Sequence, residues 1–262
     1  MKVRMLVIAM LFFFSFQHVT LATNEEWNEL NRLSDEILSL VQQERNEEAK
    51  KVLEQFSDQF ARFDITSLNM SVEDLRILTI CHEQVIRSIE SPSSSIEGRV
   101  QKAIQFRLLV DALQSEHQPM WTEMEDSIMT SFSHMKETLE RGESEYFEEQ
   151  FHDFLNKYDM ILPSAQVDIR PEYIQRVDSH LSVLGEYKQL VMNDHYHAQQ
   201  MQQMELDLRD LFTKMKEDEA DPSLIWVMIT TGSIIILTLS YVGFRKYNAD
   251  KKKQTSQREL ND

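Results

Sequence analysis

The first amphipathic segment of the chain reads NEEWNELNRLSDEILSLV at residues 24–41. Its apolar residues recur every three or four positions, as on one face of an α-helix, and they are Trp27, Leu30, Leu33, Ile37, Leu40 and Val41. After a polar break at Arg45 and Asn46, residues 46–63 repeat the pattern with Ala49, Val52, Leu53, Phe56, Phe60 and Phe63. Two such helices joined by a short link are expected to form an antiparallel hairpin, because that arrangement buries both apolar faces.

Helices are expected throughout the region that follows, because five glycines and five prolines are too few for a turn-rich β fold. A third helix opens at Ser71, with Asp74 three positions on as an approximate capping box, and ends before a serine-rich link at residues 91–95. A fourth begins near Ser95, is bent or broken near Pro119 and resumes at Trp121. The link also fits a domain boundary, although neither side has a pattern that demands independent folding. The predicted fold class is all-α, built from antiparallel helical hairpins.

An aromatic stripe follows Gly142, with Phe147, Phe151, Phe154 and Tyr158 at helical spacing. Such a stripe serves either as the lining of a ligand groove or as core packing. Burial of one face of a helix explains it fully, so core packing is the favoured interpretation. We expect an irregular connection after this helix, at residues 163–171, where a proline stands at each end.

A single long final helix is predicted from Ile174 to Met215, because apolar residues keep a near-heptad register over this segment. At about 1.5 Å per residue it would extend on the order of 60 Å. Its second half is a candidate for coiled-coil pairing, within the chain, with a partner or with a second copy. We expect its apolar face to be incompletely covered, which makes a candidate partner-binding stripe of Met201, Met204, Leu208 and Leu211. An ordinary intramolecular helix is the alternative.

The N-terminus has the layout of a secretory signal peptide at residues 1–22. Lys2 and Arg4 precede an apolar run at residues 5–16, which is too short to cross a bilayer comfortably. Small residues follow, and we expect cleavage after Ala22. An uncleaved N-terminal anchor is the alternative.

A second membrane signal lies near the C-terminus, where residues 224–244 carry no charge and are numerous enough to span a bilayer. Asp221 and Pro222 fit the cap and first turn of a transmembrane helix at residues 222–244. Six basic residues follow in the tail, residues 245–262. By the positive-inside rule this tail is cytoplasmic and residues 23–221 form an extracytoplasmic domain of a single-pass cell-membrane protein. A buried core helix is the alternative.

The extracytoplasmic domain is strongly acidic. Of 27 Lys and Arg residues, two precede residue 22 and six follow residue 244, which leaves 19, whereas 41 of the 44 Asp and Glu residues remain. The resulting charge of −22 repels phosphate backbones, so we predict no nucleic-acid partner. Such a surface attracts cations or a basic partner, but its usual role is solubility.

No catalytic pattern is found: the sequence has no phosphate-binding glycine loop, no H-E-x-x-H and no nucleophile elbow. Cys81 is the single cysteine, and a buried hydrophobe is favoured over a pairing with His82, because neighbours on a helix point about 100° apart. His195 and His197, with the more distant His180, are the best suggestion of a metal site, but residues two apart on a helix face different directions. We therefore predict no catalytic residue, no cofactor, no metal site and no enzymatic activity.

The first hairpin shows a weak likeness to one tetratricopeptide unit around Ala49, Leu53 and Phe56. Glu36 falls where that repeat has an apolar residue, and no second copy follows at the expected period, so no repeat array is predicted.

Three segments carry a family resemblance: EEWNELNRLSDE at residues 25–36, NEEAKKVLEQFSDQF at 46–60 and FLNKYDMILPSAQVDIRPEY at 154–173. Together they resemble the sporulation protein YpjB family of endospore-forming bacilli. The resemblance runs over nearly the whole chain. It implies a role connected with spore formation at a membrane, and it carries over no activity and no site residue.

Three functional hypotheses follow from these observations. The first is a membrane-tethered interaction or assembly protein, whose partners are the lipid bilayer, a membrane or envelope protein and a second copy of the chain. The second is a sensor or signalling subunit, which would need a partner because the tail at residues 245–262 holds no effector domain. The third is an envelope-acting metal-dependent hydrolase, which would require a convergent cluster of His and carboxylate side chains. The first explains the anchor, the helical surfaces and the missing catalytic patterns.

Overall fold

The structure is a computed structural model, in which the chain divides into two units, Met1–Met215 and Lys216–Asp262. The residues it describes are 19–63, 70–115, 118–142, 144–186, 195–218, 228–236, 238–239, 241–243 and 245–246. Throughout these residues the regular structure is helical, which confirms the all-α prediction.

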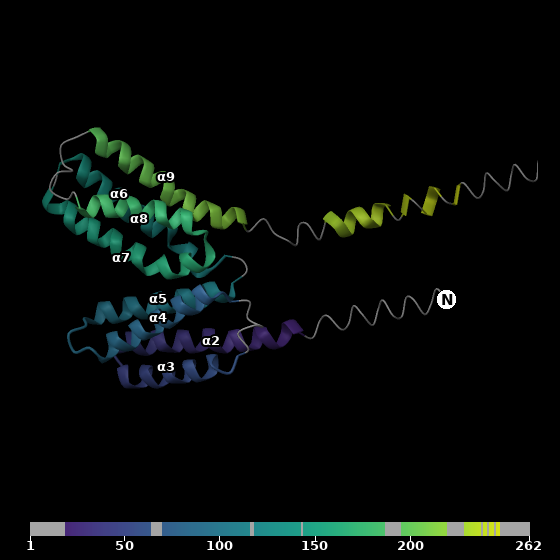
Figure 1. The fold of residues 1–262 in the computed structure, drawn as a ribbon, viewed down its shortest axis with the longest axis horizontal. Coiled ribbons are helices and arrows are strands. Elements are labelled where there is room, and N and C mark those ends of the chain that lie inside the picture. Colours follow the sequence, from purple (N-terminus) through teal and green to yellow (C-terminus); the bar gives the residue numbers. More distant parts are fainter. Residues whose placement is uncertain are drawn as a thin grey trace, which may run out of the picture. The chain divides into compact units, whose positions relative to one another are not determined.

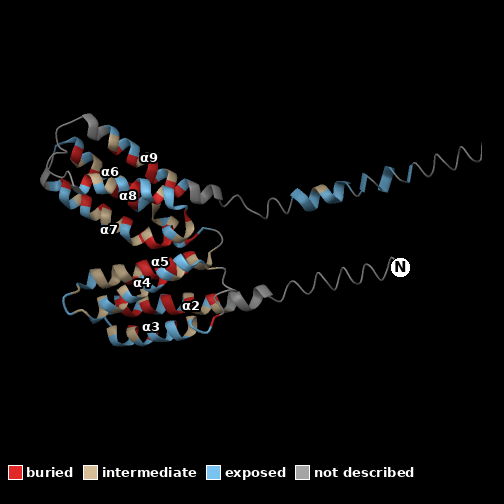
Figure 2. Ribbon diagram, in the orientation of Figure 1, coloured by how far each residue is buried: buried red, intermediate tan, exposed pale blue. Residues whose placement is uncertain are grey.

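The first unit is a set of packed helices (Figure 1). Their bounds are α2 Val19–Gln42, α3 Asn46–Phe60, α4 Val72–Glu90, α5 Ile96–Gln114, the short 3-10 helix η1 Met120–Met124, α6 Glu125–Glu140, α7 Ser144–Asp168, α8 Pro171–Glu186 and α9 His195–Asp218. Buried residues lie where the helices face one another and exposed residues on their outer sides (Figure 2).

The predicted hairpin of the first two helices is confirmed, since α2 and α3 pack side by side. All six apolar residues predicted for the first helix are buried, and so are Ala49, Val52, Leu53, Phe56 and Phe63. The start of α4 is also confirmed: the Ser71 side chain accepts from the Asp74 amide at 3.0 Å, and Asp74 accepts from the Ser71 amide at 2.8 Å.

The helix α5 is the centre of the unit, because it packs against α2, α4 and α7. Its two sides belong to different apolar clusters, with Phe106 and Leu109 in the cluster built from α2 to α5, and Leu108 and Ala112 in the cluster built from α5 to α9. A helix covered on several sides has no single apolar stripe. This is why the periodicity of its sequence did not show which face is buried.

The aromatic residues of α7 lie in the core: Phe147, Phe151, Phe154 and Tyr158 are each 3% exposed or less. Core packing is therefore the correct interpretation of this stripe. The irregular connection predicted at residues 163–171 is wrong, because α7 continues through Pro163 to Asp168 and α8 begins at Pro171. The physical reason is a hydrogen bond from the side chain of Gln105 to the carbonyl of Asp159, which replaces the bond that Pro163 removes.

The single long final helix is also wrong, because α8 and α9 lie against each other. The Nη1 atom of Arg176 in α8 is 2.9 Å from the Oδ1 atom of Asp207 in α9. In one straight helix these residues, 31 positions apart, would be separated by about 45 Å. The heptad register reflects two helices that are each buried on one face.

The predicted terminal segments are only partly described. Residues 1–18 of the predicted signal peptide and residues 247–262 of the predicted tail lie outside the described residues, and residues 19–22 form the start of α2. In the second unit, the described residues at 228–236, 238–239, 241–243 and 245–246 are helical. Within the described part of the chain, no helix has the combined length and apolar composition needed to cross a membrane.

Candidate functional site

A groove opens on the first unit where α4, α5 and α7 meet, and we call it the seam groove because it lies between the two apolar clusters. Its volume is about 290 Å³, near the lower limit for pockets that hold small ligands. Because α5 packs on both other helices, it forms the floor, and α4 and α7 form the walls. The lining residues are Arg76, Ile77, Ile80, Cys81, Gln84, Lys102, Gln105, Asp159, Leu162, Pro163 and Gln166.

Pro163 lies within α7 and contributes to one wall of the groove. Proline has no amide hydrogen, so the main-chain carbonyl of Asp159, four residues earlier, lacks its partner within the helix. The side chain of Gln105 replaces that partner, since its Nε2 donates to this carbonyl at 2.6 Å. Gln105 is 7% exposed. The bond is thus shielded from water, and it allows α7 to remain helical past a proline.

Neighbouring glutamines fix the direction of the two helices. Gln101, one turn before Gln105 on α5, donates its Nε2 to the carbonyl of Asn156 at 3.0 Å. Asn156 precedes Asp159 on α7, so both chains advance in the same direction and α5 runs parallel to α7. The helix α4 runs the opposite way, because it packs on α5 and only residues 91–95 connect the two.

Three charged side chains line the seam groove, one from each helix. Arg76 bonds Glu73 on its own helix through Nε and Nη2, which leaves its Nη1 without a partner among the described residues. Lys102 donates one Nζ hydrogen to Gln105 at 3.1 Å. Partial burial raises the pKa of the Asp159 carboxyl, and the Lys102 ammonium opposes that shift. The groove therefore holds two cations and one carboxyl, in a domain that is otherwise acidic.

Cys81 borders the groove but is only 4% exposed. Burial raises the pKa of its thiol to about 11, so at neutral pH it is protonated and a poor nucleophile. Burial lowers the pKa of the adjacent His82, whose Nε2 lies 3.1 Å from both the Leu53 carbonyl and the Ser57 hydroxyl. The two side chains have separate surroundings, and the prediction that Cys81 is a buried hydrophobe is confirmed.

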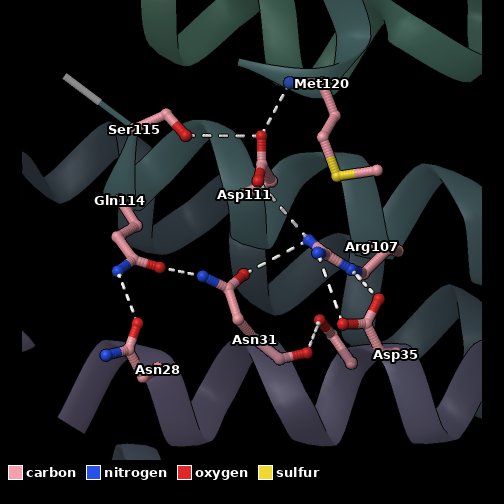
Figure 3. A network of polar contacts seen from close by, with 9 residues as sticks. Asn28, Asn31, Asp35, Arg107, Asp111, Gln114, Ser115 and Met120 are labelled. Atoms are coloured by element: carbon pink, nitrogen blue, oxygen red, sulfur yellow. Dashed lines mark hydrogen bonds and ion pairs between the residues drawn. The ribbon is translucent and has the colours of Figure 1, made fainter. Parts of the chain in front are cut away.

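A polar network holds α2 against α5 (Figure 3). Arg107, on α5, is 9% exposed and forms an ion pair with Asp35 of α2 through its Nε atom. Its Nη1 donates to Asn31 at 3.2 Å and lies 3.7 Å from a carboxylate oxygen of Asp111. Asn31 in turn donates to the side chain of Gln114. A buried guanidinium with this many acceptors is a structural anchor for α5, which carries the floor of the groove.

Two carboxyl groups position the short helix η1. Asp111 accepts from the amide of Met120 at 2.7 Å, and Asp168, the last residue of α7, accepts from the indole Nε1 of Trp121 at 2.6 Å. Burial raises the pKa of Asp168 to about 7, and although the Trp121 bond opposes this shift, the nearby carboxylates of Asp111 and Asp74 add to it. The end of α7 thus carries a carboxyl that changes its charge near neutral pH.

The candidate partner-binding stripe lies in the interior of the first unit. Each of its residues is 2% exposed or less: Met201, Met204, Leu208 and Leu211. The expectation that this face is incompletely covered is therefore wrong. Helices distant in sequence cover this face. For example, the ring centroids of Trp121 in η1 and Phe212 in α9 are 5.5 Å apart. Spacing along one helix carries no information about such cover.

Of the three histidines considered as metal ligands, the described structure places only the side chain of His180. His180 pairs with Asp207, with 2.9 Å between its Nε2 and the carboxylate, and the side chains of His195 and His197 lie outside the described residues. Across the described ranges, no group of three or more His, Cys, Asp or Glu side chains is placed to hold a metal ion. The His180–Asp207 pair joins α8 to α9 and is remote in sequence from the groove lining.

A second hollow, of about 440 Å³, lies beside the turn between α2 and α3. Three of its four charged lining residues already pair with near neighbours, because Arg45 bonds Glu48 and Arg32 bonds Glu36. The seam groove is the stronger candidate site, because three separate helices converge there and some of its polar groups are not satisfied within the fold.

Sequence reasoning did not identify the groove. Its lining comes from three helices, and no spacing within one segment brings Arg76, Lys102 and Asp159 together. Pro163 inside an apolar helical pattern was the one signal in the sequence, because a proline that does not end a helix requires a compensating donor. Gln105, in the middle of an otherwise apolar segment, is that donor.

Comparison with known proteins places the chain among relatives. Residues 27–256 match the family model described as sporulation protein YpjB (SpoYpjB). The chain is also 33% identical over 250 residues to the protein of Bacillus subtilis (strain 168) named "Uncharacterized protein YpjB". This alignment covers 95% of this chain and 94% of that relative. No solved structure matches it. The chain therefore belongs to the sporulation protein YpjB family.

Proposed function

We propose that the chain is a membrane-anchored protein of sporulating cells, whose exported helical domain, residues 23–221, binds a partner in the cell envelope. In this proposal the signal peptide at residues 1–22 is removed, residues 222–244 span the membrane and the basic tail at residues 245–262 is cytoplasmic. The role of the domain is interaction or assembly, without a catalytic step.

The observation that carries the anchor is a set of exposed apolar side chains in the second unit. Those that are more than half exposed are Met228, Ile229, Ile234, Ile235, Ile236, Leu239, Tyr241 and Val242. Soluble monomers rarely leave so many large apolar side chains together in water, and such a patch marks a surface that meets another apolar medium. No charge interrupts residues 224–244 and six basic residues follow them, which supports a lipid environment over a protein interface.

The family supports the link to sporulation, and the seam groove supports the interaction role. It brings unsatisfied cationic donors and apolar side chains into one concavity, whereas the apolar face of α9 is occupied by the domain itself. We therefore assign partner binding to the seam groove and not to α9.

Extraction of membranes with alkaline carbonate tests the anchor. We expect the protein to stay in the pellet, and the double variant Ile235→Arg, Ile236→Arg to shift into the supernatant, because each central arginine costs about 2.5–3.5 kcal/mol in a transmembrane helix. Val72→Arg is the matched control: this residue of the first unit is 87% exposed and its replacement should leave the protein in the pellet. Release of the unmodified protein by carbonate would contradict an integral anchor.

A further inference from the structure

The seam groove combines features that suit the end of a peptide chain. Its floor presents the Lys102 ammonium, with one of its three hydrogens engaged by Gln105. Its α4 wall includes Arg76, whose Nη1 has no partner among the described residues, while its α7 wall includes Asp159. Two cations and one carboxyl therefore line the groove, in a domain with an excess of acidic residues, and a ligand that carries one negative charge balances them.

Apolar side chains stand beside these charges. Ile77 and Ile80 come from α4 and Leu162 from α7, and Ile80 is 40% exposed. An aliphatic side chain of a ligand placed against them would remove apolar surface from water. Among the described residues, the side-chain amides of Gln84 and Gln166, one on each wall, have no hydrogen-bond partner, and such amides match the donors and acceptors of a peptide backbone.

The dimensions restrict what the groove holds. Neighbouring helix axes lie about 8–10 Å apart, and an extended residue spans about 3.3–3.6 Å. Two or three residues thus reach from one wall to the other. A volume of about 290 Å³ accommodates such a segment and excludes a whole helix, whose diameter with side chains is about 10–12 Å.

We propose that the seam groove binds the free carboxyl terminus of a peptide chain, with the terminal carboxylate between Arg76 and Lys102 and an aliphatic last residue against Ile77, Ile80 and Leu162. Asp159 accepts a backbone N–H of the bound segment. Binding requires no free amino group, because Lys102 offsets the charge of Asp159, the carboxyl that lines the groove. The C-terminus of a protein therefore meets every requirement of the site. This inference gives a ligand to the interaction role proposed above, and it is independent of the membrane anchor.

Calorimetric titration of the purified full chain in detergent tests this site with three peptides of one sequence. They are acetyl-Ala-Ala-Leu with a free carboxylate, its C-terminal amide, and Ala-Ala-Leu with both termini free. We expect the acetylated acid to bind and the amide to bind at least roughly tenfold more weakly, because a hydrogen-bonded charge contributes about 1.5–3 kcal/mol. The third peptide should bind as well as the first. A requirement for the free amino group would overturn the assignment, and so would equal binding of the amide.

Two variants locate the binding. Lys102→Gln and Arg76→Gln should each weaken the acetylated acid by roughly tenfold, whereas Arg87→Gln, an exposed arginine of α4 that pairs with Glu83, should not. No binding at about 10 mM peptide, or binding that neither variant weakens, would overturn the proposal. Carbonate extraction is unaffected by either result, so a failure here is distinct from a failure of the anchor.

Discussion

The side chain of Gln105 donates a hydrogen bond to the main-chain carbonyl of Asp159, the carbonyl that Pro163 deprives of its helical amide. This relationship joins the floor of the seam groove to its α7 wall. It explains why α7 passes through a proline, and it identifies a polar residue of the central helix as part of the architecture.

Gln105→Leu should therefore destabilise the fold by about 1–3 kcal/mol, because it leaves a shielded carbonyl unsatisfied. Gln101→Leu is the matched control: it also removes a bond to a carbonyl of α7, that of Asn156, but the amide of Met160 serves that carbonyl within the helix. Pro163→Ala restores the missing amide, so Gln105→Leu should cost less in its background. Urea unfolding of the parent chain, Gln105→Leu, Pro163→Ala and the double variant gives the coupling energy between the two residues. If Gln105→Leu costs the same with and without Pro163, the proposed role of Pro163 is refuted.

The buried carboxyl of Asp168 predicts a dependence of stability on pH. Its pKa is raised to about 7 in the folded chain, above the value near 3.9 of an unfolded chain. The folded state thus holds the proton more tightly, and stability should be greatest below about pH 4 for this group and decline as pH rises to about 7. Asp168→Asn removes this contribution and keeps an acceptor for the Trp121 indole.

At pH 8 the Asp168→Asn variant should be more stable than the parent chain by about 2–4 kcal/mol, and the difference should shrink towards pH 4. Thermal unfolding followed by tryptophan fluorescence over this pH range measures it. Asp58→Asn, at an exposed position of α3, serves as control and should shift the curve little. A variant at Asp168 that loses stability with rising pH as steeply as the parent would show that another group titrates.

Charges placed in the interior of α9 should unfold the domain. Met201→Glu with Leu208→Glu inserts two carboxylates among side chains that are 2% exposed or less, at a cost of about 4 kcal/mol or more. Leu206→Glu on the same helix, where the side chain is 52% exposed, should be tolerated. Circular dichroism compares the two. Native helicity and stability in the double variant would mean that this face is not core.

Residues 24–217 expressed alone should be soluble, strongly helical and insensitive to reductant. The first unit extends to Met215 and has its own apolar clusters, and with Cys81 as the only cysteine no internal disulfide exists to be reduced. Melting curves with and without dithiothreitol should coincide. A transition that moves by more than a few degrees would reveal a role for Cys81 that its burial does not suggest.

Local features were readable from the sequence, and long-range ones were not. The α2–α3 hairpin, the Ser71–Asp74 cap and the aromatic core of α7 follow from spacing within one segment, and each was predicted. The division of this region into α8 and α9 was missed, because two helices buried on one face each show the same heptad pattern as one long helix. The groove was missed because it exists only where three helices meet. The burial of the apolar face of α9 was missed because the residues that cover it come from η1 and from α6 to α8.

The orientation of the chain in the membrane is the most direct test of the proposed function. Intact protoplasts that produce the protein with an epitope tag after Asp262 would be treated with external protease, and the membranes probed for the tag and for the helical domain. We predict loss of the domain and survival of a small membrane fragment that carries the tag, because the basic tail lies inside. Digestion of the tag with protection of residues 24–217, or protection of both until the cells are lysed, would contradict an exported domain held by a C-terminal anchor.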